Sequence, residues 1–189
     1  MRRRLLNLYQ QYRIAKFRLL SECKNVQGRP TILQPVQLAG RGTIRFNGTV
    51  KLGCYPSGYF LSGYIYIEAR TPEAVIEIED GVWMNNNVAI ISNGAGISIG
   101  KRTMLGTHVE IVDSDFHDLH PDRRGDPGKS AKVEIGENVF IGPNVKILKG
   151  VRIGNNCIIA NGTVLTRSVP DNMLAFGNPA RQGFGLRQE

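Results

Sequence analysis

An aliphatic residue recurs at every sixth position near the C-terminal end of the chain, and this spacing limits the possible folds more than any other feature. The six residues are Ile135, Ile141, Ile147, Ile153, Ile159 and Leu165. The fourth position after each of them is mostly small or β-branched. A period of six differs from the 3.6 of a helix and is too regular for independent hairpins, so each hexad is predicted to form one short strand and one corner. Strands stacked in this way bury one large residue per corner inside a long prism.

The same period is present further upstream. Trios spaced by six begin at Ile99, at Ile78 and, more weakly, at Leu38. The pattern slips near residues 56–63 and around Asn93, and it lapses across residues 113–132. We expect this last segment to be a loop extruded from the coil.

Composition fits a single soluble domain. With 189 residues, 41% hydrophobic and 7% aromatic, the chain can bury a core, and a stack of repeats explains the bias toward aliphatic side chains. The cysteines Cys23, Cys54 and Cys157 are odd in number and lack CxxC spacing, so reduced thiols are expected. No apolar run approaches the roughly eighteen residues of a membrane span, and no apolar segment of a signal peptide follows the first arginines. These features predict a cytoplasmic protein.

Basic residues are concentrated at the N-terminus of a chain whose net charge is +8. They are Arg2, Arg3, Arg4, Arg13, Lys16 and Arg18, and no acidic residue precedes Glu22. Apolar residues follow close to helical spacing at Leu5, Leu8, Tyr9, Tyr12, Leu19 and Leu20. Residues 1–25 are therefore predicted to form a basic amphipathic helix. Its apolar stripe either caps the open end of the prism, or its arginines hold the protein peripherally at the inner membrane. No nucleic-acid partner is expected, because the remaining chain lacks a basic patch interleaved with aromatic residues.

The repeats resemble those of the hexapeptide-repeat acyltransferases through the block VEIGENVFIGPNVKILKGVRIGNNCIIANGTVLTRSVPDN and the GNPAR that follows. From Trp83 to Arg181 the chain is most similar to galactoside, maltoside and polysaccharide O-acetyltransferases. The resemblance implies an all-β fold, a left-handed parallel β-helix over residues 30–175 with an N-terminal helix, the extruded loop 113–132 and a C-terminal tail, residues 176–189. Three hexads would make one coil, so that residues 135–152 and 153–170 each form a full turn. It also implies a homotrimer with acetyl-CoA in the groove between neighbouring prisms.

The expected loop, IVDSDFHDLHPDRR, carries the candidate general base. By the resemblance, His117 takes the proton from a sugar hydroxyl, which is a weak nucleophile until an imidazole accepts that proton. Asp115 is predicted to orient this imidazole, with Asp113 and Asp118 as alternatives that the sequence does not separate. His120 is the rival base and otherwise a residue that contacts the acceptor. The remaining histidine, His108, lies inside a hexad, where packing or solvent exposure is the default.

Other predicted contacts divide between acceptor and donor. Asn86 matches the family asparagine that orients the acceptor, because an amide both donates and accepts, although asparagines also end hexads as corner residues. Trp83 either stacks on a sugar ring or packs in a corner. For acetyl-CoA the resemblance assigns Phe140, Ala160, Asn161, Gly162, Thr166, Arg167 and Arg181. An arginine suits the 3′-phosphate. Pro143 stands where several relatives have serine or glycine, and it has no N–H to offer an oxyanion.

These residues predict an acetyl-CoA-dependent O-acetyltransferase that modifies a sugar hydroxyl during surface-polysaccharide synthesis and needs no metal. Two other classes stay open. A zinc hydratase of the γ-carbonic anhydrase kind places three histidines on one ion, and the chain has three in total. A non-catalytic β-helix scaffold at a membrane would use only the surfaces of the prism.

Overall fold

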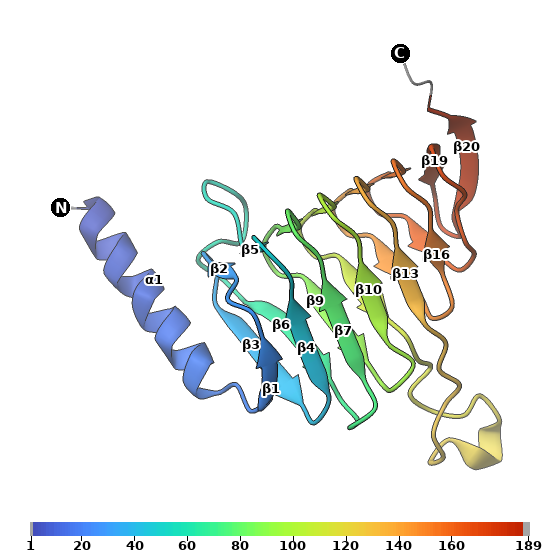
Figure 1. Ribbon diagram of the computed structural model, residues 1–189, viewed down its shortest axis with the longest axis horizontal. Coiled ribbons are helices and arrows are strands. Elements are labelled where there is room, and N and C mark those ends of the chain that lie inside the picture. Colours follow the sequence, from blue (N-terminus) through green and yellow to red (C-terminus); the bar gives the residue numbers. More distant parts are fainter. Residues whose placement is uncertain (1, 187–189) are drawn as a thin grey trace.

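The computed structural model describes residues 2–186, in which one α-helix, α1 (Arg2–Leu19), precedes a stack of short strands (Figure 1). The strands form three sheets. Sheet A contains β1 (Asn25–Gln27), β4 (Thr43–Phe46), β7 (Val75–Ile78), β10 (Ile97–Ile99), β13 (Val133–Ile135) and β16 (Arg152–Ile153). Sheet B contains β2 (Thr31–Ile32), β5 (Lys51–Leu52), β8 (Trp83–Met84), β11 (Met104–Leu105), β14 (Phe140–Ile141), β17 (Ile158–Ile159), β19 (Met173–Phe176) and β20 (Arg181–Gly185). Sheet C contains β3 (Val36–Gly40), β6 (Ile65–Ala69), β9 (Ala89–Ser92), β12 (Glu110–Val112), β15 (Lys146–Ile147) and β18 (Val164–Leu165).

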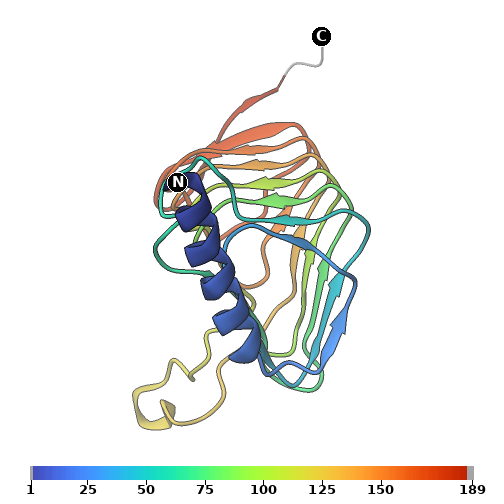
Figure 2. The same cartoon turned by 90° about the vertical axis from the view of Figure 1, so that its left-hand side faces the viewer.

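From β1 to β18, successive strands visit sheets A, B and C in turn, so the chain winds around a common interior as a parallel β-helix (Figure 2). Strand β13 pairs with β16, with Ile135 opposite Ile153. In the same register, Phe140 lies opposite Ile158 on sheet B. These residues thus pair with residues 18 positions further along, which confirms the turn expected at residues 135–152. The next turn is shorter than the expected 153–170, because Ile153 pairs with Val169 and Ile158 with Leu174, 16 positions further along.

The hexad pattern also predicts the core. All six aliphatic residues of the final run, and the residue four places after each, are buried. The corners between them are tight, and asparagines occupy their left-handed positions, with φ of 55° at Asn138 and 56° at Asn156. Asparagine tolerates this conformation better than most residues. Its amide also donates to the next coil, as Asn138 Nδ2 does to Asn156 Oδ1 at 3.0 Å. At the glycine corners the coils approach too closely for a side chain, since a Cβ on Gly100 would lie 2.5 Å from the Gly136 carbonyl oxygen.

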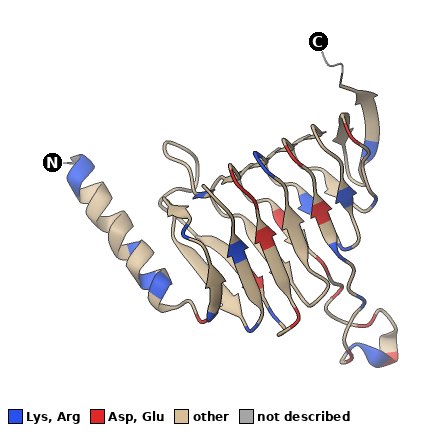
Figure 3. Ribbon diagram, viewed as in Figure 1, with Lys and Arg blue, Asp and Glu red and all other residues tan. Residues whose placement is uncertain are grey.

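The outer faces of the sheets differ in chemistry. Sheet A carries opposite charges on neighbouring strands, as in the 2.6 Å pair of Arg45 and Glu77 (Figure 3). Sheet B instead carries Trp83, Met104 and Phe140 in register on three adjacent strands. All three are among the exposed large hydrophobic residues. Sheet A is therefore suited to water, and sheet B offers an apolar surface.

Both ends of the stack differ in detail from the sequence prediction. Helix α1 ends at Leu19. It packs on the first coil and on the segment between β5 and β6 through Gln10, Arg13 and Ile14 rather than through the predicted apolar stripe, which is exposed. At the other end, the predicted tail of residues 176–189 contains β20, which pairs antiparallel with β19 and extends sheet B. No helix within residues 2–186 is long and apolar enough to cross a membrane.

Candidate active site

Residues 113–132 leave the coil between β12 and β13 and form an irregular hairpin (yellow in Figures 1 and 2). Its two arms meet at an antiparallel bridge between His117 and Pro127. A short 3₁₀ helix, η1 (Pro121–Arg123), lies near its tip. The arms approach so closely that a Cβ on Gly128 would lie 2.6 Å from the His117 carbonyl oxygen. The backbone of the candidate base is thus held by the opposite arm of the hairpin.

The base of this hairpin is fixed by Asp113, whose side chain is fully buried. Its carboxylate accepts hydrogen bonds from Ser92 Oγ at 2.6 Å, from the Asn93 N–H at 2.6 Å and from the Gly96 N–H at 2.8 Å. A buried carboxylate is tolerated when its oxygens are satisfied in this way. Asp113 therefore anchors the hairpin to the turn after β9.

The His117 side chain is exposed and has one hydrogen-bond partner on the hairpin, the Arg124 carbonyl oxygen at 2.9 Å from Nδ1. A carbonyl oxygen only accepts, so Nδ1 carries the proton and donates it. In the neutral ring Nε2 then keeps its lone pair. The Asp115 carboxylate, predicted to orient this ring, instead lies 3.1 Å from Lys149 Nζ. The Asp118 carboxylate lies 3.4 Å from Arg123 Nε.

A second set of contacts holds the hairpin from the outer face of sheet C. Phe116 adopts a left-handed φ of 62°, and the Arg70 guanidinium lies 4.7 Å from the centre of its ring. Arg70 in turn donates to both carboxylate oxygens of Glu68, at 2.8 and 2.9 Å. This hydrogen bonding raises the pKa of Arg70, and burial together with Glu68 raises the pKa of Tyr66 to about 12. The residue before His117 is thus held by a charged guanidinium beside a neutral phenol.

The other two histidines have different partners. His120 Nδ1 accepts from the Asp122 N–H at 3.3 Å and caps η1. His108 lies on the coil, with Nε2 3.2 Å from Asn87 Nδ2 and its ring edge-on to Tyr59. Within residues 2–186 no group of three or more His, Cys, Asp or Glu side chains is arranged to hold a metal ion. The zinc-hydratase alternative, which needs three histidines on one ion, therefore gains no support from the described residues.

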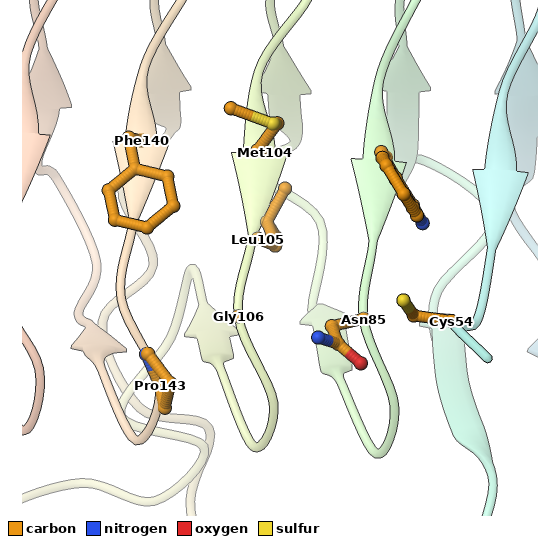
Figure 4. Close-up of a pocket in the computed structure, with 8 residues that line it drawn as sticks. Cys54, Asn85, Met104, Leu105, Gly106, Phe140 and Pro143 are labelled. Carbon is orange, nitrogen blue, oxygen red and sulfur yellow. The ribbon is translucent and has the colours of Figure 1, made fainter. Parts of the chain in front are cut away.

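A cavity of about 240 Å³ opens on sheet B (Figure 4). It is lined by Cys54, Trp83, Asn85, Met104, Leu105, Gly106, Phe140 and Pro143. Phe140 and Met104 stand next to each other on adjacent strands (Figure 4). Trp83 is not packed in a corner, and its Nε1–H donates to the Gly53 carbonyl at 3.1 Å. The cavity therefore combines an apolar wall with a few polar groups at the strand ends.

The asparagine triplet after β8 divides between the interior and this cavity. Asn86 is fully buried, and its Nδ2 donates to the carbonyls of Cys54 at 3.1 Å and Gly58 at 2.8 Å. Its amide thus holds the segment between β5 and β6 and is not open to an acceptor. Asn85 lines the cavity instead. The alternation of a strand could have indicated this, because Met84 is buried and side chains two positions apart face the same way.

The predicted donor residues lie on the last coils. Arg167 and Arg181 line a common cavity of about 350 Å³ with Leu165, Ser168, Val169, Ala175, Ala180 and Gln182. Asn161, Gly162 and Thr166 are exposed, and Ala160 is half-buried. The structure therefore brings the two predicted phosphate-binding arginines together at the C-terminal end of the prism.

Within one chain, His117 and the apolar cavity belong to different corners of the prism. The hairpin connects sheet C to sheet A (Figure 2). The residues that line the cavity belong to sheet B and to its turns toward sheet C. His117 is not among the residues that line the cavity. A single copy therefore does not bring His117 and the apolar cavity together into one active site.

A model of the family described as bacterial transferase hexapeptide (six repeats) matches residues 132–167. WbbJ of Escherichia coli (strain K12), which carries the provisional name lipopolysaccharide biosynthesis O-acetyl transferase, is 32% identical over 147 residues, 73% of this chain and 72% of that protein. The galactoside O-acetyltransferase of Lactococcus lactis subsp. lactis (strain IL1403) is 39% identical over 100 residues, 52% of this chain and 47% of that protein. The chain spans about half the length of the Lactococcus protein and of two further curated relatives.

Solved structures share the fold. A mutant of AntD, an N-acyltransferase from Bacillus cereus in complex with dTDP-4-amino-4,6-dideoxyglucose and coenzyme A, has a TM-score of 0.68 at 14% identity, over 92% of this chain and 88% of that chain. A hexapeptide-repeat acetyltransferase from Vibrio cholerae has a TM-score of 0.61 at 24% identity, over 95% and 82% of the two chains. Stacked hexads in three parallel sheets define a β-helix protein of the hexapeptide-repeat class. Because it matches WbbJ over most of both chains, this chain belongs to the hexapeptide-repeat acyltransferase family.

Proposed function

We propose that this protein is an acetyl-CoA-dependent O-acetyltransferase that modifies a sugar hydroxyl in surface-polysaccharide synthesis. The observation that carries the proposal is the state of His117, whose Nδ1–H is donated to the Arg124 carbonyl while the side chain is exposed on the hairpin. Family membership supports acyl transfer, and relatives named as galactoside and lipopolysaccharide O-acetyltransferases support a sugar acceptor.

His117 would act as the general base. A sugar hydroxyl within hydrogen-bond reach of Nε2 gives its proton to that atom as its oxygen attacks the acyl carbon. The Arg124 carbonyl keeps the ring in the required tautomer and stabilises the imidazolium that forms, a task that an aspartate performs in many hydrolases. Asp113 and Arg70 hold the hairpin, which keeps the lone pair of His117 Nε2 pointing in one direction. Such positioning contributes to the rate by itself.

Acetyl-CoA supplies the acetyl group, and two surfaces suit its parts. The apolar wall of Met104 and Phe140 fits the thioester arm, because sites for such groups are mostly apolar with a few polar atoms. Arg167 and Arg181 fit its phosphates, since a guanidinium donates two hydrogen bonds to phosphate oxygens. Pro143 has no N–H, so any donor to the thioester oxygen comes from another residue.

We infer further that the active enzyme is a homotrimer of left-handed β-helices. The separation of His117 from the apolar cavity within one chain supports this, because a neighbouring copy packed side by side can bring its hairpin to the cavity of the first. Heterologous contacts of this kind generate a closed ring of identical subunits when the rotation between neighbouring copies closes. The exposed apolar row on sheet B offers a surface for this packing.

Asn85 and Asn86 are expected to respond differently to substitution. Asn85 Oδ1 already accepts from the Asn86 N–H at 2.8 Å, so its NH₂ group is the part free to donate to an acceptor hydroxyl. Asn85→Ala should raise the KM for the acceptor about tenfold, with stability nearly unchanged, because it removes one hydrogen bond to substrate. Asn86→Ala should instead lower the free energy of unfolding by about 2–4 kcal/mol, because buried donors and acceptors lose their partners. Steady-state kinetics and urea unfolding of both variants measure the difference, and the reverse pattern would reinstate Asn86 as the acceptor residue.

The proposed function is tested by measuring CoA release from acetyl-CoA against a panel of free sugars, sugar nucleotides and lipid-linked glycans. We expect release to depend on one class of acceptor and the product to carry an ester on oxygen, as read by mass spectrometry and by its lability to mild base. Transfer only to amino sugars would replace the O-acetyl proposal by an N-acetyl one. Binding of neither CoA nor any acceptor would favour the non-catalytic scaffold.

A further inference from the structure

Helix α1 is attached to the prism by one face only. Gln10 Nε2 donates to the Leu33 carbonyl at 2.8 Å, and Arg13 Nη1 donates to the Phe60 carbonyl at 3.0 Å. Arg13 and Gln10 are both buried, although their side chains are polar. Buried hydrogen bonds from a guanidinium are among the stronger protein contacts. These contacts fix the rotation of the helix about its own axis.

The opposite face carries an apolar row that nothing in residues 2–186 covers. Its members are Leu5, Leu8, Tyr12, Ala15 and Leu19, all of them exposed. Leu8 is 67% exposed and Leu19 is 86% exposed. They follow each other at alternating spacings of three and four residues, which places them on a single stripe of a helix. Leu8 and Tyr12 are each two residues from Gln10, or about 200° around the axis, so the stripe points away from the prism.

Basic residues border this apolar row on both sides. Arg4, Lys16 and Arg18 are exposed, and no Asp or Glu occurs before Glu22 (Figure 3). An exposed apolar stripe flanked only by positive charge is complementary to a surface that is apolar inside and negative outside. An anionic lipid bilayer has that structure. The row also contains Tyr12, a residue type that is enriched where headgroups meet acyl chains.

A second copy of the same helix fits this surface less well. The spacing of three and four is that of a coiled-coil seam, but the seam is only about two heptads long, which is short for stable pairing. Its flanking positions carry only basic charge, at Arg4, Lys16 and Arg18, so a second copy offers no carboxylate to pair with them. Like charges at these positions repel. Charge complementarity therefore selects the bilayer.

We propose that α1 lies in the plane of an anionic membrane surface, with Leu5, Leu8, Tyr12 and Leu19 in the interface and Arg4, Lys16 and Arg18 at the headgroups. The helix is too polar to span the bilayer, in agreement with the absence of any spanning helix in residues 2–186. Because Arg13 and Gln10 tie it to the core, membrane contact orients the whole prism. If the proposed function holds, the acceptor class is then a glycan linked to a lipid. The membrane contact itself does not depend on that function.

The test is co-sedimentation of the full chain with lipid vesicles. We expect binding to vesicles of phosphatidylcholine mixed with phosphatidylglycerol in a ratio of roughly 3:1, and little binding to phosphatidylcholine alone. Replacing both Leu8 and Leu19 with serine should weaken binding at least about tenfold, because the variant no longer buries the apolar surface of these two leucines in the membrane. Replacing Lys16 and Arg18 with glutamine should weaken it about fivefold per charge and reduce its salt sensitivity.

Phe184→Ser is the matched control, because Phe184 is a large exposed apolar residue at the other end of the prism (68% exposed, on β20). We expect this variant to bind vesicles like the unchanged protein. Circular dichroism should show that the leucine double variant keeps its fold, since both leucines are exposed.

Failure to bind the anionic vesicles, or equal binding by the double variant, would overturn the proposal. A drop in oligomer mass caused by the double variant, with vesicle binding retained, would also overturn it and assign the stripe to a second copy. Acetyl transfer to soluble sugars is measured separately, so that a failed vesicle test and a failed proposed function give different results.

Discussion

Replacing His117 with alanine is expected to lower kcat for acetyl transfer by about 10²- to 10⁴-fold, the range that a positioned general base contributes. The side chain is exposed and makes one hydrogen bond, to the Arg124 carbonyl, so its loss should hardly change the unfolding midpoint. The KM for acetyl-CoA should also stay near its original value, because the apolar cavity does not include this residue. Steady-state CoA release together with a thermal melt separates the catalytic effect from any effect on the fold.

The matched control for this experiment is His120→Ala on the same hairpin. His120 Nδ1 accepts from the Asp122 N–H and caps a single turn, so its removal should cost a few-fold in rate at most. The two histidines are three residues apart and both exposed, yet only His117 is held in one tautomer by a carbonyl. A large loss of kcat in His120→Ala with near-normal activity in His117→Ala would transfer the role of base to His120.

The core could be predicted residue by residue because its cause is local. Each hexad repeats the same strand and corner, so the phase of Ile141 or Ile147 is fixed by its neighbours in the sequence and not by distant segments. Corner residues such as Asn138 and Gly136 follow from the same logic, since a tight corner selects residues that tolerate left-handed φ or leave room for the next coil. The pairing of Ile135 with Ile153 then follows from the length of the repeat.

The site residues were harder to predict because their roles depend on contacts between distant segments. Asn86 is hydrogen-bonded to the carbonyls of Cys54 and Gly58. These two residues lie on a segment whose path the repeat does not specify. The hydrogen-bond partner of His117 is a backbone carbonyl, which every residue has, so the sequence does not indicate it. Asp115 was predicted instead because it is close to His117 in the sequence. Helix α1 was predictable from its spacing, but the face that docks was not, because Arg13 is held by carbonyls of the segment between β5 and β6.

Replacing Asp113 with alanine is expected to lower the free energy of unfolding by about 3–5 kcal/mol. Three donors, Ser92 Oγ and the N–H groups of Asn93 and Gly96, lose their acceptor in a place where Asp113 and Ser92 are fully buried. Each buried donor left unpaired costs roughly 1–3 kcal/mol, and partial relaxation keeps the total below the sum of the largest values. Urea unfolding followed by circular dichroism measures the change. Because Asp113 begins the hairpin that holds His117, kcat should fall in the same variant even below its unfolding midpoint.

Asp115→Ala is the control that isolates burial as the cause. Its carboxylate is two residues away on the same hairpin and pairs with Lys149 at 3.1 Å, with 23% and 29% of the two side chains exposed. A partly exposed pair of this kind contributes at most about 1 kcal/mol. Asp113→Asn should fall between the two, because the amide keeps one acceptor oxygen but turns an NH₂ group toward donors. Equal losses of stability in Asp113→Ala and Asp115→Ala would mean that the hairpin is not anchored through the buried carboxylate, and that the coil on either side of it holds His117 in place.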